Sequence, residues 1–270
     1  MRASFLDSID WQQPWLLPLH AAVAPIMHAA DWRRAINTEA AAKGLRNRQG
    51  MPIHFVPQAD LPADTAYESF IHATGAVPTR DNLHDFFNAL VWLTFPDIKV
   101  QLNALQSSEI IKLATAPSDI SHGSHRGKLR DAATIFDENA ALLIVRDTEL
   151  VDALRDHRWH DVFVTRRAAF GRDCEVWLFG HALMEKLVSP YKSITAHAWV
   201  VIPSQAYFAM SMQDKRAWID TQVTRQLMHG MATSDFTPLP VMGVPGWWGN
   251  QDNMFYDDVT VFRPKRGINR

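Results

Sequence analysis

The stretch LHDFFNALVWLTFP, residues 83 to 96, has the periodicity of a helix, but its second face is unusual. One broad side is apolar at helical spacing and consists of Leu83, Phe86, Phe87, Leu90 and Val91. The opposite side lacks the Lys and Glu of a solvated face and instead carries His84, Asp85, Asn88 and Trp92. We therefore expect protein to cover both sides of this helix. The polar side is either a site or a polar seam inside the core.

The segments around this helix predict a mainly helical first half. Pro96 lacks a backbone donor and clashes with the preceding turn, so we expect a kink or a restart there, with Thr94 as the cap of a helix over 97–114. Upstream, the pattern predicts a helix over 29–44 and a short strand in IHFV, 53–56. It also predicts a helix over 65–75, with a capping box of Thr65 and Glu68 and a stop at Gly75.

Beyond a polar loop at 115–127, apolar runs alternate with helical patterns. Strands are expected at 141–145, 173–180 and 193–203, and helices at 147–159, 181–188 and 215–231. This alternation predicts an α+β or α/β fold in which a helical half, 1–115, packs on a small mixed sheet with flanking helices, 128–264. The Pro-, Gly- and Trp-rich tail, 236–264, is expected to cross the surface as an arm. We expect the whole chain, 1–270, to form one compact unit.

Composition and charge narrow the class of protein. The chain has 270 residues and a net charge of -2, so no general basic field favours nucleic-acid binding. Cys174 is the only cysteine, which excludes an intrachain disulfide and fits a reducing compartment. No apolar run in the sequence is long enough to span a bilayer. We expect a cytoplasmic protein without a membrane partner.

Several motifs together resemble one known family. They are HDFFNALVWLTFP, RDAATIFDEN, FGHALMEKLVSPYK, FTPLPVMGVPGWW and NMFYDDVTVFRP, in this order. The set resembles the bacterial family catalogued as domain of unknown function 3025, from about His84 to Pro264. The resemblance implies a bacterial protein of unassigned biochemical role and implies no catalytic residues.

The first candidate cluster lies on the helix of the opening stretch. His84, Asn88, Trp92 and Lys99 fall in one stripe at about 100° per residue. A His and an Asn one turn apart can hold a ligand or a metal ion. The alternative is a buried helix whose polar groups bond to neighbouring backbone.

A second cluster is Arg130, Asp131, Asp137 and Glu138, just before the strand at 141–145. Carboxylates beside a strand end are common metal or acid–base positions, and an Arg can bind an anion with two hydrogen bonds. The alternative is a turn formed by DEN, with Arg130 and Asp131 paired locally.

A third cluster surrounds the start of the helix at 181. The free N–H groups of a helix start attract anions, Gly180 permits close approach, and His181 shares a helix face with Glu185. Lys192 and His197 follow in the next loop and strand and could reach the same crevice. The alternatives are a simple capping Gly and a structural core His.

These clusters favour an enzyme acting on a small anionic substrate by His- and carboxylate-assisted hydrolysis, with or without a divalent metal ion. His84, Asn88, Asp131, Glu138 and His181 are the predicted catalytic set. The predicted substrate-binding set is Arg130, Gly180, Lys192, His197 and Trp92. The alternative is a non-catalytic ligand-binding or protein-interaction module, and nucleic-acid binding would need a continuous patch of Arg166, Arg167 and Arg172. An enzyme requires His84, Asp131, Glu138 and His181 to meet in one pocket.

Overall fold

The computed structural model describes residues 3–115 and 127–265. The helices are α1 (His20–Val23), α2 (Trp32–Ala42), α3 (Tyr67–Thr74), α4 (Leu83–Thr94), α5 (Pro96–Thr115), α6 (Lys128–Asn139), α7 (Thr148–Arg155), α8 (His181–Lys186), α9 (Met212–Leu227) and α10 (Asn253–Tyr256). The strands are β1 (His54–Pro57), β2 (Ala76–Thr79), β3 (Ala140–Val145), β4 (Cys174–Leu178), β5 (Thr195–Val201) and β6 (Thr237–Pro240). Helices dominate both halves, and the fold is α+β.

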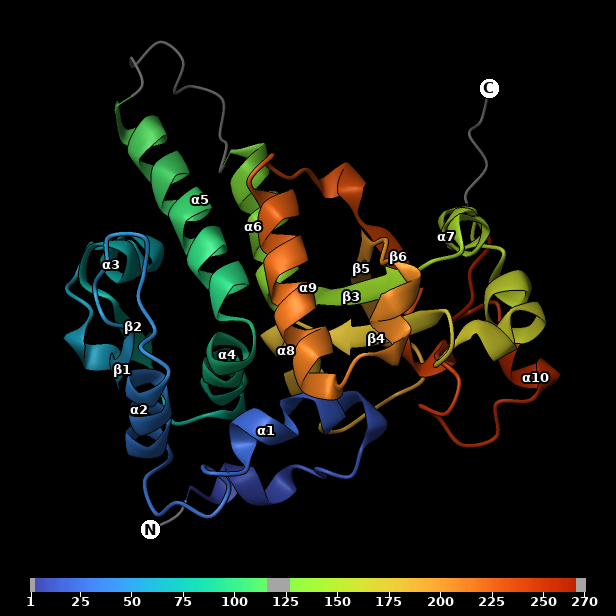
Figure 1. The fold of residues 1–270 in the computed structure, drawn as a ribbon, viewed down its shortest axis with the longest axis horizontal. Coiled ribbons are helices and arrows are strands. Elements are labelled where there is room, and N and C mark those ends of the chain that lie inside the picture. Colours follow the sequence, from blue (N-terminus) through green and yellow to red (C-terminus); the bar gives the residue numbers. More distant parts are fainter. Residues whose placement is uncertain (1–2, 116–126, 266–270) are drawn as a thin grey trace.

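The main sheet has the strand order β4-β3-β5-β6 and is mixed, as predicted. β3 runs parallel to β5 and antiparallel to β4, and β6 is antiparallel to β5. All six residues of β3 are buried, which explains why its sequence, AALLIV, is a continuous apolar run without alternation. In Figure 1, α6 and α9 lie against this sheet.

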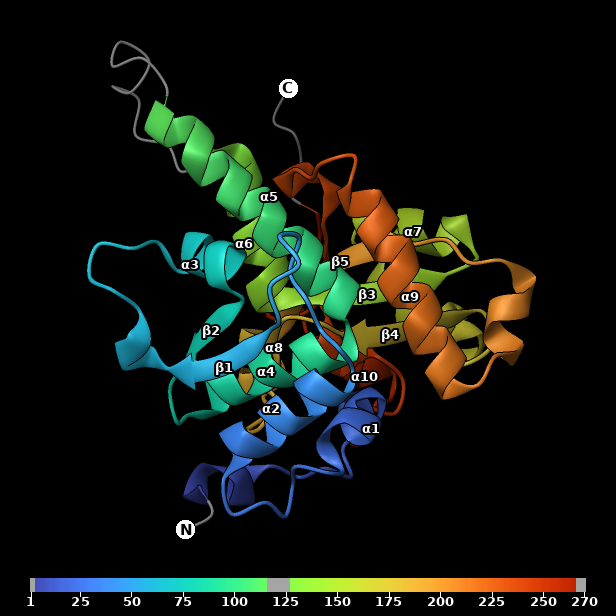
Figure 2. The same cartoon turned by 60° about the vertical axis from the view of Figure 1, so that its left-hand side comes forward.

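A second, smaller sheet pairs β1 with β2 in parallel at the other side of the molecule. Figures 1 and 2 show α4 and α5 between the two sheets. β1 was predicted, but β2 was not, because its sequence is AVPT and Pro78 argues against a strand. The predicted helical half therefore contains a short parallel strand pair.

The helix of the opening stretch, α4, is buried on both sides as predicted. Every residue from Asp85 to Thr94 is buried, and Asn82 caps the helix by accepting a hydrogen bond from the Asp85 N–H. The predicted break is confirmed: α4 ends at Thr94 and α5 begins at Pro96.

The cap of α5 comes from a distant helix, so the prediction of Thr94 as its cap is wrong. The Asp220 carboxylate of α9 accepts hydrogen bonds from the backbone N–H groups of Asp97 (3.1 Å) and Ile98 (2.9 Å). The Thr94 hydroxyl instead donates to the Leu90 carbonyl, 2.7 Å away. A capping residue that lies far along the chain leaves no local sequence signal.

Two further local predictions are corrected. The residues DEN form no turn; they end α6 at Asn139, and β3 starts at Ala140 with no residue between them. The capping box at α3 is also absent, since Ala66 is the N-cap and the Glu68 carboxylate accepts from Asn103 Nδ2 at 2.6 Å. Gly75 does end this helix, with φ of 75°.

The C-terminal tail is part of the packed structure and not a surface arm. Its first segment is β6, an edge strand of the main sheet, and Val241 and Met242 after it are fully buried. Phe255, Tyr256 and Phe262 pack together farther on. Buried apolar residues form one cluster that runs from Leu6 to Phe262. Within the described residues, no helix has both the length and the apolar character needed to cross a membrane.

Candidate metal centre

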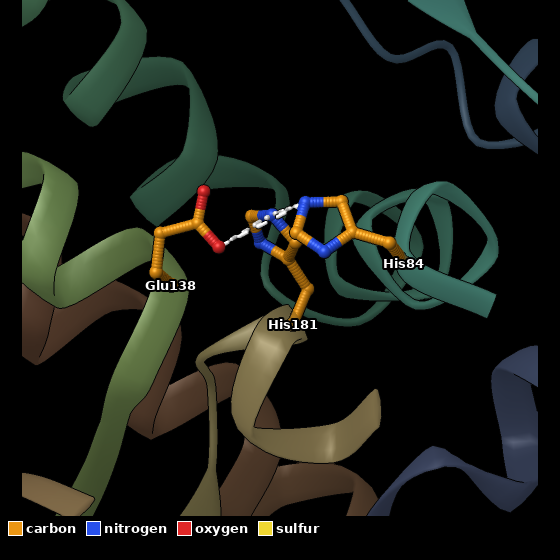
Figure 3. A group of neighbouring side chains, drawn as sticks. All are labelled: His84, Glu138 and His181. Atoms are coloured by element: carbon orange, nitrogen blue, oxygen red, sulfur yellow. Dashed lines mark hydrogen bonds and ion pairs between the residues drawn. The ribbon is translucent and has the colours of Figure 1, made fainter. Parts of the chain in front are cut away.

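Three side chains from three helices meet beside the main sheet. His84 lies in the first turn of α4, Glu138 in the last turn of α6, and His181 is the first residue of α8. Figure 3 shows them pointing toward one another. His84 Nε2 is 3.1 Å from His181 Nε2, and Glu138 Oε2 is 3.4 Å from His181 Nε2 and 3.8 Å from His84 Nε2. The group is one that could hold a metal ion.

The helices meet here because backbone packs on backbone at Gly180. α8 contacts both α4 and α6. The N–H groups of Phe179 and Gly180 both donate to the Ala140 carbonyl, at 3.1 and 2.8 Å. A Cβ at position 180 would lie 2.5 Å from the Glu138 carbonyl oxygen and from the Asn139 nitrogen. Glycine therefore allows His181 to approach Glu138 across the end of α6.

We call His84, Glu138 and His181 the triad. A carboxylate outside the triad orients His84. Its Nδ1 lies 3.0 Å from Glu185 Oε2 on α8, which favours a proton on Nδ1 and leaves a lone pair on Nε2. That lone pair faces His181 Nε2. In the absence of a cation, one of the two facing nitrogens must carry a proton and donate it to the other.

The spacing of the three ligand atoms fits a first-row divalent ion. A triangle with sides of 3.1, 3.4 and 3.8 Å has a circumscribed radius of about 2.0 Å, close to the roughly 2.0–2.2 Å bonds that His nitrogen and carboxylate oxygen make to Zn²⁺. The three atoms are therefore spaced so that one ion could be held by all of them. Two His and one carboxylate also leave coordination positions open for water or substrate.

Burial keeps His181 suited to metal binding. Burial lowers the pKa of His181 to about 4, so that its imidazole is neutral at pH 7 and a nitrogen lone pair is available. Burial and the neighbouring Asp137 raise the pKa of Glu138 above its ordinary value. A positive ion between these groups would relieve the repulsion between the carboxylates.

A buried layer of polar groups supports the triad from behind. Lys99 Nζ donates to Asp137 Oδ1 at 2.6 Å and to Asn88 Oδ1 at 2.8 Å. Burial works to raise the pKa of Asp137, but Lys99 and the two histidines outweigh it and lower that pKa below its ordinary value. Lys99 also lies 5.4 Å from the centroid of the Trp92 ring. Every member of this layer has a partner.

The triad opens into a cavity of about 560 Å³, a size typical of small-molecule sites. Besides His84, Glu138 and His181, its walls include Arg130, and also residues of α3 and the chain around it. Arg80 lines the cavity too, but its guanidinium is neutralised by Asp85, with Nε–Oδ2 and Nη2–Oδ1 distances of 3.0 Å. Arg130 forms no ion pair with any residue in the described ranges.

Comparison of the sequence with known families identifies the family of this chain. Residues 53–266 match the model of a family described as a protein of unknown function, DUF3025. The chain belongs to this family. No curated protein and no solved structure matches it significantly. All three residues of the triad lie within the matched part of this DUF3025 protein.

The structure brings together part of the predicted site of this DUF3025 protein. Of the predicted catalytic residues, His84, Asn88, Glu138 and His181 line the cavity, and predicted substrate-binding Arg130 joins them. Asp131 does not, because one residue along α6 turns its side chain by about 100°, and it is exposed. The expected convergence therefore holds for three of its four residues.

The other predicted substrate-binding residues lie elsewhere. Trp92 is buried behind the cavity beside Lys99. Lys192 pairs with Asp258 at 2.7 Å and lies 4.4 Å from the Phe255 ring centroid, so it anchors the tail. His197 is exposed on β5, beside Phe236. Gly180 has a packing role in place of the expected anion-binding role, because backbone fills the space in front of it.

The cavity lies at the carboxyl end of β4 but at the amino end of β3. Because β4 is antiparallel to β3, its last residue, Leu178, pairs beside Ala141 at the beginning of β3. His181 therefore faces the amino end of β3 and the carboxyl end of α6. Sequence reasoning gave β4 no direction relative to β3, and the rule for crevices in parallel sheets does not apply to this pair.

Sequence reasoning also missed the roles of three residues of the site. Glu185 was paired with His181 by its helical spacing, but it bonds His84 instead. Lys99 and Asp137 were noted in separate clusters, and only the packing of α5 on α6 joins them. Their signal in the sequence is a lysine and an aspartate in otherwise buried helix faces.

Proposed function

We propose that the protein is a hydrolase of a small anionic substrate that works with a divalent metal ion held by His84, His181 and Glu138. The observation that carries the proposal is the ion-sized triangle formed by the two Nε2 atoms and Glu138 Oε2. Clustered titratable groups in one cavity favour an enzyme over a binding module, whose pocket needs no such cluster.

An ion at this position would polarise a substrate carbonyl or phosphoryl oxygen and lower the pKa of a bound water. The protein residues have three tasks. The triad would hold the ion at one end of the cavity, Glu185 orients the His84 ring, and Arg130 neutralises the substrate's charge. The nitrogen and oxygen donors suit Zn²⁺, Mn²⁺ or Fe²⁺ better than Ca²⁺, which prefers oxygen ligands alone.

The proposal about the partner follows from the pairing of surface arginines. Two of the three arginines that could bind nucleic acid are already neutralised: Arg166 pairs with Asp147 and Glu149, and Arg172 pairs with Asp173. Arg167 donates instead to the uncharged side chains of Tyr256 and Gln251. This supports a small anion, rather than nucleic acid, as the partner. We retain the proposal that the protein is bacterial and acts in the cytoplasm.

The test begins with metal content. Protein purified without a His tag and dialysed against Zn²⁺, Mn²⁺ or Fe²⁺ should retain about one ion per chain and melt at a higher temperature than the chelator-treated protein. His84→Ala and Glu138→Gln should abolish both effects. His197→Ala, which removes an exposed histidine on β5, is the matched control and should behave as the wild type.

Metal-loaded protein should then hydrolyse at least one member of a panel of chromogenic esters, amides and phosphoesters that carry a second acidic group. Glu138→Gln should be inactive on the same compound. Absence of any retained ion, or equal retention by the triad variants and the wild type, would reject the metal centre. Ion binding without hydrolysis of any compound would favour the ligand-binding module.

A further inference from the structure

We infer that the substrate is a bifunctional anion, in which an anionic group bound by Arg130 is separated by a short spacer from the bond that is cleaved at the triad. This inference rests on the proposed function. It defines the substrate class by the distance between the anionic group and the bond that is cleaved, which the metal centre alone does not specify. The carboxylate and the phosphate dianion share the chemistry that an arginine recognises, and the experiment separates them.

The first support is the register of α6. Arg130, Thr134 and Glu138 are four residues apart, lie on one helix face and all line the cavity. The eight residue steps from Arg130 to Glu138 correspond to a rise of about 12 Å along the helix. The cavity therefore extends along two turns of α6, with a metal ligand at one end and a cation at the other.

The second support is the pairing of the charged side chains around the cavity. Two other cations in or beside the cavity are already paired, Arg80 with Asp85 and Lys99 with Asp137. Arg130 has no ion pair in residues 3–115 and 127–265, and its Nε is buried without a hydrogen-bond partner. A buried guanidinium nitrogen without a partner is costly, and an anionic ligand would satisfy it.

Another acidic residue of the cavity does not take that place. Glu68 lines the same cavity, but its carboxylate accepts from Asn103 Nδ2 and lies outside ion-pair distance of Arg130. Burial, followed by the charge of Asp137, raises the pKa of Glu68.

The span excludes very small anions as good substrates. An anion that contacts both the ion and Arg130 must bridge a distance on the order of 10 Å. This distance follows from the rise of α6 between Arg130 and Glu138, shortened because the two side chains can bend toward each other. A single acetate or phosphate would contact one end only. A molecule with an acidic group a few atoms from an ester or amide carbonyl would contact both ends.

The experiment uses metal-chelating probes of graded length. Hydroxamates that carry a terminal carboxylate on chains of one to eight methylenes are titrated into the Zn²⁺-loaded full chain by calorimetry, beside acetohydroxamate and the methyl esters. A second series carries a terminal phosphonate. We expect affinity to peak at an intermediate length and to exceed that of the matching ester by about tenfold, the value of one charge-assisted contact of about 1.4 kcal/mol.

Arg130→Gln should remove this advantage and leave the affinity for acetohydroxamate unchanged. Lys128→Gln, which removes an exposed lysine from the same turn of α6, should retain it. The series with the higher peak identifies the anion as carboxylate or phosphate. An affinity that does not depend on chain length, or an advantage that persists in Arg130→Gln, would overturn the inference.

The two proposals can fail separately. Zinc-dependent binding of acetohydroxamate, without any gain from the anionic tail, would reject the bifunctional substrate and keep the metal centre. Failure of every hydroxamate to bind, together with no retained zinc, would reject the metal centre and the inference with it.

Discussion

Glu185 Oε2 accepts from Nδ1 of His84 at 3.0 Å, so a carboxylate on α8 sets the orientation of an imidazole on α4. The other nitrogen of that ring faces His181, which is also on α8. One short helix thus supplies both a metal-ligand candidate and the group that orients a second one. A carboxylate behind a histidine ligand fixes its tautomer and increases its basicity.

Glu185→Ala should therefore weaken metal binding without abolishing it. We expect the affinity for Zn²⁺ to fall roughly 10–100-fold, the usual cost of losing such a partner. Titration against a chelating dye measures the change. Glu185→Gln, which can still accept from Nδ1, should fall between the wild type and Glu185→Ala. Equal affinities for all three proteins would show that Glu185 does not position His84.

Gly180→Ala should destabilise the protein, because its Cβ would lie within 2.6 Å of three backbone atoms of residues 138–140. Backbone cannot move aside as a flexible side chain does, so we expect a loss of about 1–3 kcal/mol or more in the free energy of unfolding by urea. Gly249→Ala is the control, since nothing lies within 4 Å of its Cβ position. A loss no larger than that of the control would contradict the close packing of α8 on the end of α6.

Lys99→Met should cost more than a surface charge, because it leaves Asp137 without its cation in a buried layer. Breaking a buried ion pair by removing one partner costs about 3–5 kcal/mol. Urea unfolding of the single variant and of Lys99→Met combined with Asp137→Asn measures the effect. We expect the double variant to recover part of the loss. A double variant less stable than Lys99→Met would show that the pair is not the source of the cost.

The cap of α5 predicts a dependence of stability on pH. Burial raises the pKa of Asp220 to about 7, although the hydrogen bonds from Ile98 and Asp97 oppose the rise. The folded state therefore favours the protonated carboxyl. Its stabilising contribution is complete below the unfolded-state pKa near 4 and is lost as the pH rises through about 7.

Asp220→Asn should remove this dependence. Between about pH 4.5 and 8, the wild type should lose on the order of 2–4 kcal/mol relative to the variant. Urea unfolding of both proteins across this range gives the difference directly, because other titrating groups are common to both. Parallel stability curves would mean that Asp220 titrates alike in the folded and unfolded chains.

The elements with strong periodicity could be predicted from the sequence. α4 and β3 have dense apolar patterns that suit one structure each, and the break at Pro96 follows from the chemistry of proline. β2 and the packed tail could not be predicted, because proline in their sequences argues locally against strands. Tertiary packing overrides that preference in both segments.

The residues of the candidate site were recognisable one at a time, but their meeting was not. His84 and His181 are 97 positions apart, and each was assigned to a different cluster. Only the contacts of α8 with α4 and α6 bring them together. Asp131 shows the converse. It is chemically suitable and lies next to Arg130 in the sequence, but its side chain is exposed. Residue type can nominate a ligand, whereas helix phase and packing decide whether it reaches the site.

The direct junction between α6 and β3 makes this region sensitive to chain length. α6 ends at Asn139 and β3 begins at Ala140, so the sheet fixes the rotation of the helix that carries Glu138. One inserted or deleted residue in the last turn of α6 would rotate the preceding part of the helix by about 100° relative to β3 and move Arg130 out of line with the triad. Substitutions can therefore change the chemistry of the cavity step by step, but an insertion or deletion here would disrupt its layout at once.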